Sequence, residues 1–201
     1  MAEVLITLGI IGVIAAITIP ILQNKQEEQQ LKTAYKKAFS VATQAVNSAN
    51  REYLYTGQSS SENPNIRRDN FIVFMSQFKT VKKCENNNNS DCWNSTGEKF
   101  QNFWPYASGV AFIDSSGMSW SMISYNTNAI IVDTNGLKPP NQYGKDRFGL
   151  SLRSQNNSIT EGIPVKVQPY QDNPPEGWGV CDVPNKCATE KNYFGTSWLY
   201  K

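Results

Sequence analysis

The first 22 residues of the chain are apolar almost without interruption and carry one charge, on Glu3. As a helix rising about 1.5 Å per residue, residues 4–22 would span roughly 28 Å, close to the hydrocarbon thickness of a bilayer. No Lys or Arg precedes Lys25, which argues against an ordinary signal peptide. A plain membrane anchor stays open as one interpretation of this segment. A carboxylate at the edge of such a segment is costly unless it meets a cation or reaches the interface, so we expect Glu3 to have a partner.

The pattern then becomes amphipathic. Apolar residues recur at intervals of three and four, which predicts that the helix continues from near Ala2 to about Tyr55 with one face covered by a domain. These residues are Leu31, Ala34, Tyr35, Ala38, Val41, Ala42, Ala45, Val46, Ala49 and Tyr53. We therefore divide the chain into a membrane or assembly segment, residues 1–24, and a globular domain, residues 25–201, that includes the amphipathic half of the helix.

A second helix is predicted over residues 68–81, with Phe71, Met75 and Phe78 on its apolar side. Lys79, Lys82 and Lys83 would lie near its C-terminus, where cations complement the helix dipole. A nucleic-acid-binding patch is the other interpretation of these lysines.

The middle of the chain has the short alternating runs of an antiparallel sheet. Residues 109–113 and 118–125 predict a hairpin around a turn at 114–117, and residues 129–133 predict a central strand covered by the helix. Residues 163–168 predict one more strand, and the rest of the chain after Arg153 is expected to be mostly loop. The predicted fold class is α+β, with the long helix packed on an antiparallel β-meander.

The amino-acid composition argues against several classes of function. The 201 residues include 19 basic and 17 acidic residues, and a net charge of +2 does not favour a nucleic-acid partner. The chain has no histidine, which excludes Ser-His-Asp and Cys-His nucleophile systems, and we expect no enzymatic activity. The carboxylate pair Asp114 and Asp133 would be the basis of an enzyme hypothesis, but it belongs to no recognisable motif.

The four cysteines are Cys84, Cys92, Cys181 and Cys187. Four cysteines allow three pairings, and we favour the two between sequence neighbours, Cys84 with Cys92 and Cys181 with Cys187. Neither pair has the Cys-x-x-Cys spacing typical of a zinc site.

Residues 2–20, AEVLITLGIIGVIAAITIP, resemble the N-terminal segment of type IV pilins and type II secretion pseudopilins. The resemblance implies that Glu3 neutralises the terminal amine of a neighbouring subunit, that the helix loosens near Gly9 and Gly12, and that Pro20 kinks it. Glu3 lies two residues earlier than in that family, and the family's basic leader does not precede Met1, so we expect the amine partner to lie outside this numbering.

The same resemblance implies a function. The chain would be a structural subunit of a type IV-like filament, processed and methylated by the prepilin peptidase, inserted in the bacterial inner membrane, and assembled with copies of itself or other pilins by the assembly machinery. The filament would be periplasmic or on the cell surface. The alternative is a membrane-tethered extracytoplasmic binding protein or adhesin that uses aromatic residues near the C-terminus, namely Trp178, Tyr193, Phe194, Trp198 and Tyr200.

Residues 133–148 carry closely spaced oxygen ligands, and two interpretations stay open. In one, Asn135-Gly136 supplies positive φ for a turn while Asp133 and Asp146 cap backbone amides. In the other, Asp133, Asn135 and Asp146 are calcium ligands. The spacing does not match an EF-hand, but some major pseudopilins bind calcium in a comparable loop.

Overall fold

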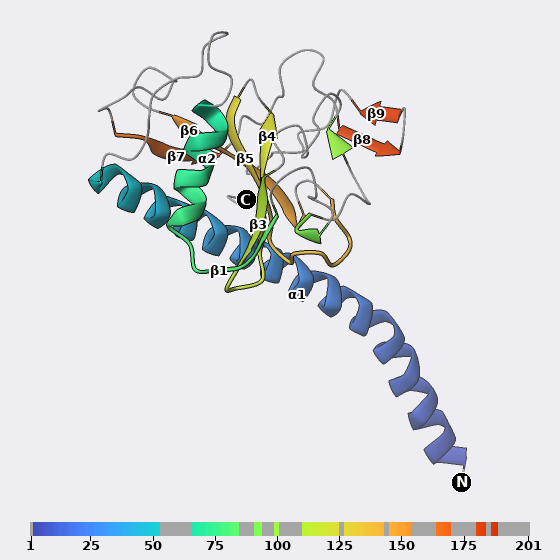
Figure 1. The fold of residues 1–201 in the computed structure, drawn as a ribbon. Helices are drawn as coiled ribbons and strands as arrows, with labels where there is room; N and C mark the ends of the chain where they lie inside the picture. Colours follow the sequence, from blue (N-terminus) through green and yellow to red (C-terminus); the bar gives the residue numbers. More distant parts are fainter. Residues whose placement is uncertain are drawn as a thin grey trace.

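The structure, a computed structural model, describes residues 2–52, 66–84, 91–93, 99–100, 110–124, 127–142, 145–153, 164–169, 180–183 and 186–188. A single helix, α1 (Ala2–Arg51), extends from the domain, and its N-terminal half bends away from the packed half (Figure 1). The predicted long helix is therefore confirmed. Tyr53 and Tyr55, at its expected end, lie outside the described residues.

The C-terminal half of α1 packs on the sheet through small side chains. Ala38, Ala42, Ala45 and Ala49 are buried at the predicted spacing, and alanine lets the helix axis approach the sheet closely. Tyr35 begins this buried stripe, and its ring centroid lies 4.6 Å from that of Phe148 in the sheet.

The second helix, α2 (Ile66–Ser76), begins two residues earlier and ends five residues earlier than predicted. The N–H groups of Gln77 and Phe78 bond the carbonyls of Phe74 and Met75 and close the helix. The following residues form the strand β1 (Thr80–Cys84), which pairs with a neighbouring strand. The helix does not continue because the hydrogen bonds of the sheet compete with those of a further helical turn.

The prediction that Lys79, Lys82 and Lys83 lie near a helix C-terminus is therefore wrong. Lys82 and Lys83 lie on β1, and Lys79 precedes it. The Nζ of Lys82 forms an exposed ion pair with Asp91, at 3.0 Å.

Six antiparallel strands form the main sheet, in the order β1-β3-β4-β5-β6-β7. Beyond β1 they are β3 (Ala111–Asp114), β4 (Ser119–Ser124), β5 (Thr127–Asp133), β6 (Arg147–Arg153) and β7 (Lys166–Pro169). The α+β class, the hairpin and the internal position of the third predicted strand are confirmed. The strand expected over residues 163–168 begins three residues later, at Lys166.

We did not predict β6, although Phe148, Leu150 and Leu152 alternate along it and are all buried. The expectation of loop after Arg153 was also wrong in part. A second sheet, in the order β2-β8-β9, contains β2 (Lys99–Phe100), β8 (Val180–Val183) and β9 (Lys186–Ala188).

The core lies between the helices and one face of the main sheet (Figure 1). Phe74 and Phe78 contact Trp120, with centroids 5.7 and 5.1 Å apart, and both also pack on Phe112. The opposite face of the sheet carries Ser119, Asp133 and Arg147, which the strand register places in one row across three strands. This row leads to the polar site described below.

Candidate functional site

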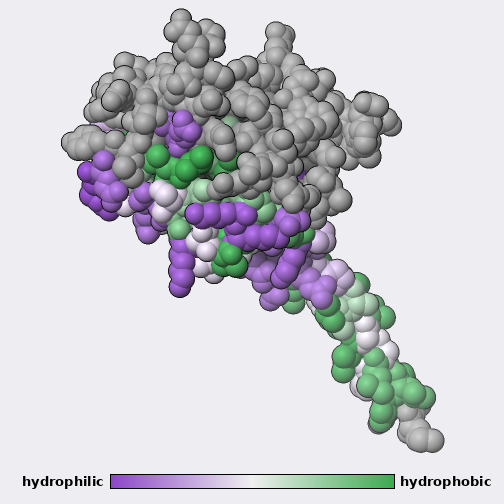
Figure 2. All heavy atoms as spheres, viewed as in Figure 1, coloured by the Kyte–Doolittle hydropathy of each residue, from purple (hydrophilic) through white to green (hydrophobic). Residues whose placement is uncertain are grey.

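The free half of α1 is an apolar surface with no cover from its own domain (Figure 2). It presents twelve large aliphatic side chains, each at least half exposed: Val4, Leu5, Ile6, Leu8, Ile10, Ile11, Val13, Ile14, Ile17, Ile19, Ile21 and Leu22. Among the described residues, α1 is the one helix long and apolar enough to span a membrane. This is consistent with single-pass membrane anchoring.

The polar groups within this surface are satisfied inside the helix. The hydroxyl of Thr7 donates to the carbonyl of Val4 at 3.0 Å, and that of Thr18 donates to the carbonyl of Ile14 at 2.9 Å. Both hydroxyls can therefore enter a lipid environment without an unpaired donor.

The predicted assembly residues all lie on this free half. A Cβ on Gly9 or Gly12 would meet nothing within 4 Å, so these glycines leave the helix surface open to a close neighbour. Pro20 lies inside α1 and cannot donate to the carbonyl four residues earlier, which favours bending of the kind seen in Figure 1.

Glu3 is exposed in the first turn of α1, where a carboxylate complements the helix dipole. Its carboxylate has no ion-pair or hydrogen-bond partner within the part of the chain that the structure describes. Met1 does not belong to that part. The cation that we expect for Glu3 is therefore not provided by the described part of its own domain.

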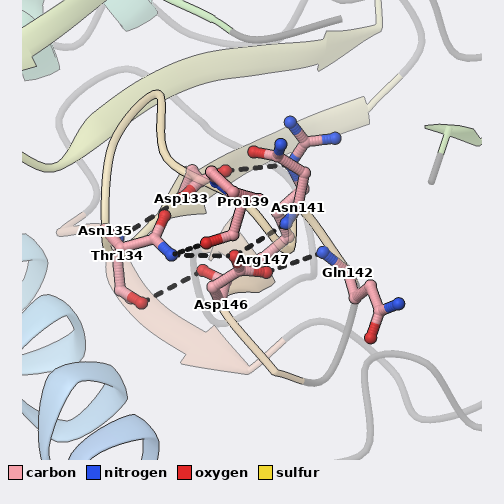
Figure 3. Close-up of polar contacts among 8 residues, drawn as sticks. All are labelled: Asp133, Thr134, Asn135, Pro139, Asn141, Gln142, Asp146 and Arg147. Atoms are coloured by element: carbon pink, nitrogen blue, oxygen red, sulfur yellow. Dashed lines mark hydrogen bonds and ion pairs between the residues drawn. The ribbon is translucent and has the colours of Figure 1, made fainter. Parts of the chain in front are cut away.

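A second candidate site is the loop between β5 and β6, residues 133–147 (Figure 3). Asp146 is fully buried and accepts three N–H bonds. The amides of Asn141 and Gln142 donate to it at 2.8 and 2.6 Å, and Nδ2 of Asn135 donates at 3.0 Å. Asp146 thus closes the loop by capping backbone amides, as one of the two interpretations expected.

Asp133 pairs with Arg147, its partner across the β5–β6 ladder. The Nε of Arg147 donates to Oδ2 of Asp133 at 2.9 Å, and both side chains are 1% exposed. The guanidinium carbon lies 4.9 Å from the ring centroid of Trp93, a cation–π contact. Burial and then the charge of Asp146 raise the pKa of Asp133 to about 7, although Arg147 acts in the opposite direction.

The turn at Asn135-Gly136 is the predicted one, since Gly136 has a φ of 77°. It packs against the β3–β4 turn so closely that a Cβ on Gly136 would collide with the carbonyl oxygen of Gly117. Asn141 also has positive φ, 54°, a conformation that asparagine tolerates better than most residues.

The residues predicted as calcium ligands are brought together, and the Oδ1 of Asn135 is buried without a hydrogen-bond partner among the described residues. The other contacts of these residues do not suit a cation. Calcium takes six to eight oxygen ligands, whereas Asp146 faces N–H donors and Asn135 turns its NH₂ group toward Asp146 and the carbonyl of Pro139. Arg147 adds a positive charge beside Asp133. These contacts favour the capped-turn interpretation, and calcium binding stays a prediction.

Cys84 and Cys92 form a disulfide, with Cα atoms 6.0 Å apart. It places the following residue, Trp93, in the buried position beside Arg147. The backbones of Cys181 and Cys187 face each other across β8 and β9, and their side chains lie outside the described residues.

Asp114 and Asp133, the pair considered for an enzyme, do not share a site. Asp114 accepts a hydrogen bond from Nε1 of Trp120 at 2.8 Å, on the core side of the sheet. Asp133 bonds Arg147 on the opposite face. Sequence reasoning missed Arg147 and Trp93; the signal for Arg147 was its charge across the turn from Asp133.

The comparisons with known proteins identify no relative: no family model, no curated protein and no solved structure matches this chain.

Proposed function

We propose that this protein is a structural subunit of a type IV-like filament, a pilin or pseudopilin, that assembles through the N-terminal half of α1. The observation that carries the proposal is the free apolar half of α1 with Glu3 at its end. The resemblance of residues 2–20 to the pilin N-terminal segment supports the same function.

The exposed surface needs a cover in every state of the protein. Fully burying one Val, Leu or Ile side chain contributes about 1.5–3 kcal/mol, so twelve exposed in water would be strongly unfavourable. A membrane covers them before assembly, and the helices of neighbouring subunits cover them in a filament. The small residues Gly9 and Gly12 suit close helix packing in that second environment.

Glu3 provides the specificity that the apolar side chains cannot. Between lipid and a neighbouring helix, an aliphatic side chain gains little, because both surroundings are apolar. A carboxylate in the same place is costly until it meets a cation, so the subunit position that pairs it is favoured over all others. The terminal amine of a neighbouring subunit would be that cation.

The first prediction concerns Glu3→Ala. We expect this variant to fold and insert into the membrane as the parent does, but to be lost from sheared and pelleted filaments by at least tenfold. Glu27→Ala is the matched control, because Glu27 is an exposed glutamate on the same helix, beyond the apolar segment. Filament incorporation of Glu3→Ala at the level of the control would contradict the proposal.

The alternative, a tethered binding protein or adhesin, would remain a monomer in the membrane. Its aromatic residues Trp178, Tyr193, Phe194, Trp198 and Tyr200 lie outside the described residues, so no contact favours it. A photo-crosslinking residue placed at Ile11 distinguishes the two functions: the filament proposal expects crosslinks between copies of α1, and the adhesin expects none.

A further inference from the structure

The loop between β5 and β6 buries three charged side chains within a few residues of one another. Asp133, Asp146 and Arg147 are each 1% exposed or less. A buried charge is costly unless it is paired and hydrogen-bonded, so the loop must supply a counter-charge for its two carboxylates.

Arg147 is held in place by the backbone as well as by its own side chain. It is the Cα partner of Asp133 in the β5–β6 ladder, so the cation and the carboxylate face the same side of the sheet. The ring of Trp93 covers the guanidinium group at 4.9 Å, and the Cys84–Cys92 disulfide anchors the chain directly before Trp93. The β5–β6 ladder, the ring of Trp93 and the disulfide that anchors Trp93 therefore together fix the position of this cation.

Asn135 connects the two carboxylates. Its backbone N–H donates to Oδ1 of Asp133 at 3.3 Å, and its Nδ2 donates to Oδ2 of Asp146 at 3.0 Å (Figure 3). The same Nδ2 also donates to the carbonyl oxygen of Pro139, at 3.1 Å. Both hydrogens of the NH₂ group therefore have acceptors, and the group places a donor rather than an oxygen beside Asp146. The Oδ1 of Asn135 is buried and has no hydrogen-bond partner in the part of the chain that the structure describes.

We propose that Arg147 is the built-in counter-ion of this loop, and that the loop folds without a metal because the guanidinium group supplies the positive charge that a divalent cation would otherwise supply. A calcium ion between the carboxylates would have to displace N–H donors from Asp146 and approach a guanidinium group. This inference does not rest on the filament proposal, since it concerns the folding of one subunit.

The test is thermal unfolding of the full chain in non-ionic detergent, in EDTA and in millimolar calcium chloride. An ion that binds only the folded chain, at about a hundred times its Kd, raises the Tm of a protein of this size by roughly 5 to 10 °C. We expect the parent protein to show no calcium-dependent shift, and Arg147→Gln to have a lower Tm in EDTA that calcium raises by several degrees.

Two controls separate the charge of Arg147 from other effects. Lys166→Gln removes an exposed cation from the same sheet and should leave both Tm values unchanged. Arg147→Lys keeps the charge without the fork of N–H donors, so it should be less stable than the parent and still insensitive to calcium.

A calcium-dependent rise in the Tm of the parent would overturn the proposal, and so would a folded Arg147→Gln that ignores calcium. If Arg147→Gln fails to fold in EDTA, its recovery in calcium supports the proposal. If it folds in neither solution, calcium titration of the parent by calorimetry decides, with heat of binding as the contradicting result.

Discussion

Gly117 and Gly136 occupy the tips of adjacent turns and both have positive φ, 85° and 77°. Their surroundings differ. A Cβ on Gly117 would meet nothing within 4 Å, whereas one on Gly136 would collide with the carbonyl oxygen of Gly117. The need for glycine at position 136 thus has two causes, backbone conformation and the approach of a second turn, and only the first is shared with position 117.

The two glycines give a matched pair of substitutions. Gly117→Ala should cost about 1–2 kcal/mol in the free energy of unfolding, the penalty for a Cβ in the left-handed region. Gly136→Ala should cost about 1–3 kcal/mol more, because one of the two turns must also move. Urea unfolding of both variants measures the difference, and equal costs would show that the two turns do not constrain each other.

At the scale of elements, α1 is joined to the far edge of the sheet through Asn50. Its Nδ2 donates to the carbonyl of Val165 at 2.7 Å, and its Oδ1 accepts the N–H of Val165 at 2.9 Å. The side chain imitates a strand partner for the residue that precedes β7. It therefore holds the last turn of α1 against the edge of the main sheet.

Asn50→Ala should lower the free energy of unfolding by about 1–3 kcal/mol, since it leaves both polar groups of Val165 without this partner. Asn47→Ala is the matched control, because Asn47 is exposed on the same helix one turn earlier; we expect it to change stability by less than about 0.5 kcal/mol. Equal effects of the two substitutions in chemical denaturation would contradict this role of Asn50.

At the scale of the whole molecule, the chain has a packed domain and a helical segment that contributes nothing to its core. No residue from 3 to 30 is buried, and burial along α1 begins at Tyr35. The apolar surface of the free half is thus available to lipid or to other subunits, while the folding of the domain depends on the second half of α1.

Removal of residues 1–24 should therefore leave a soluble domain whose Tm lies within a few degrees of that of the full chain in detergent. The physical reason is that the deleted side chains bury no surface against the domain. Circular dichroism and size exclusion test this expectation. A truncated chain that loses its cooperative unfolding transition would show that the free half stabilises the domain.

Several features could be predicted from the sequence because their causes are local. The unbroken apolar run, the three- and four-residue spacing after it, and the turn residues around 114–117 and at Asn135-Gly136 each specify a structure from neighbouring residues alone. Where local signals competed, prediction failed: Thr80 and Val81 lie on β1 rather than in the helix, because β1 pairs with β3, with an irregularity in the register between Thr80 and Lys82.

The contacts of the polar loop were decided by the tertiary structure. Asp133 and Asp146 were candidate ligands in the sequence, but the partner of Asp133 comes from strand register, which places Arg147 opposite it. Arg147 is in turn covered by Trp93, a disulfide-anchored residue more than fifty positions away. The sequence by itself determined that the chain has an apolar helix with one charge near its start and a sheet domain after it. Only the tertiary structure decided that Arg147 faces Asp133, because that contact depends on which residues pair across β5 and β6.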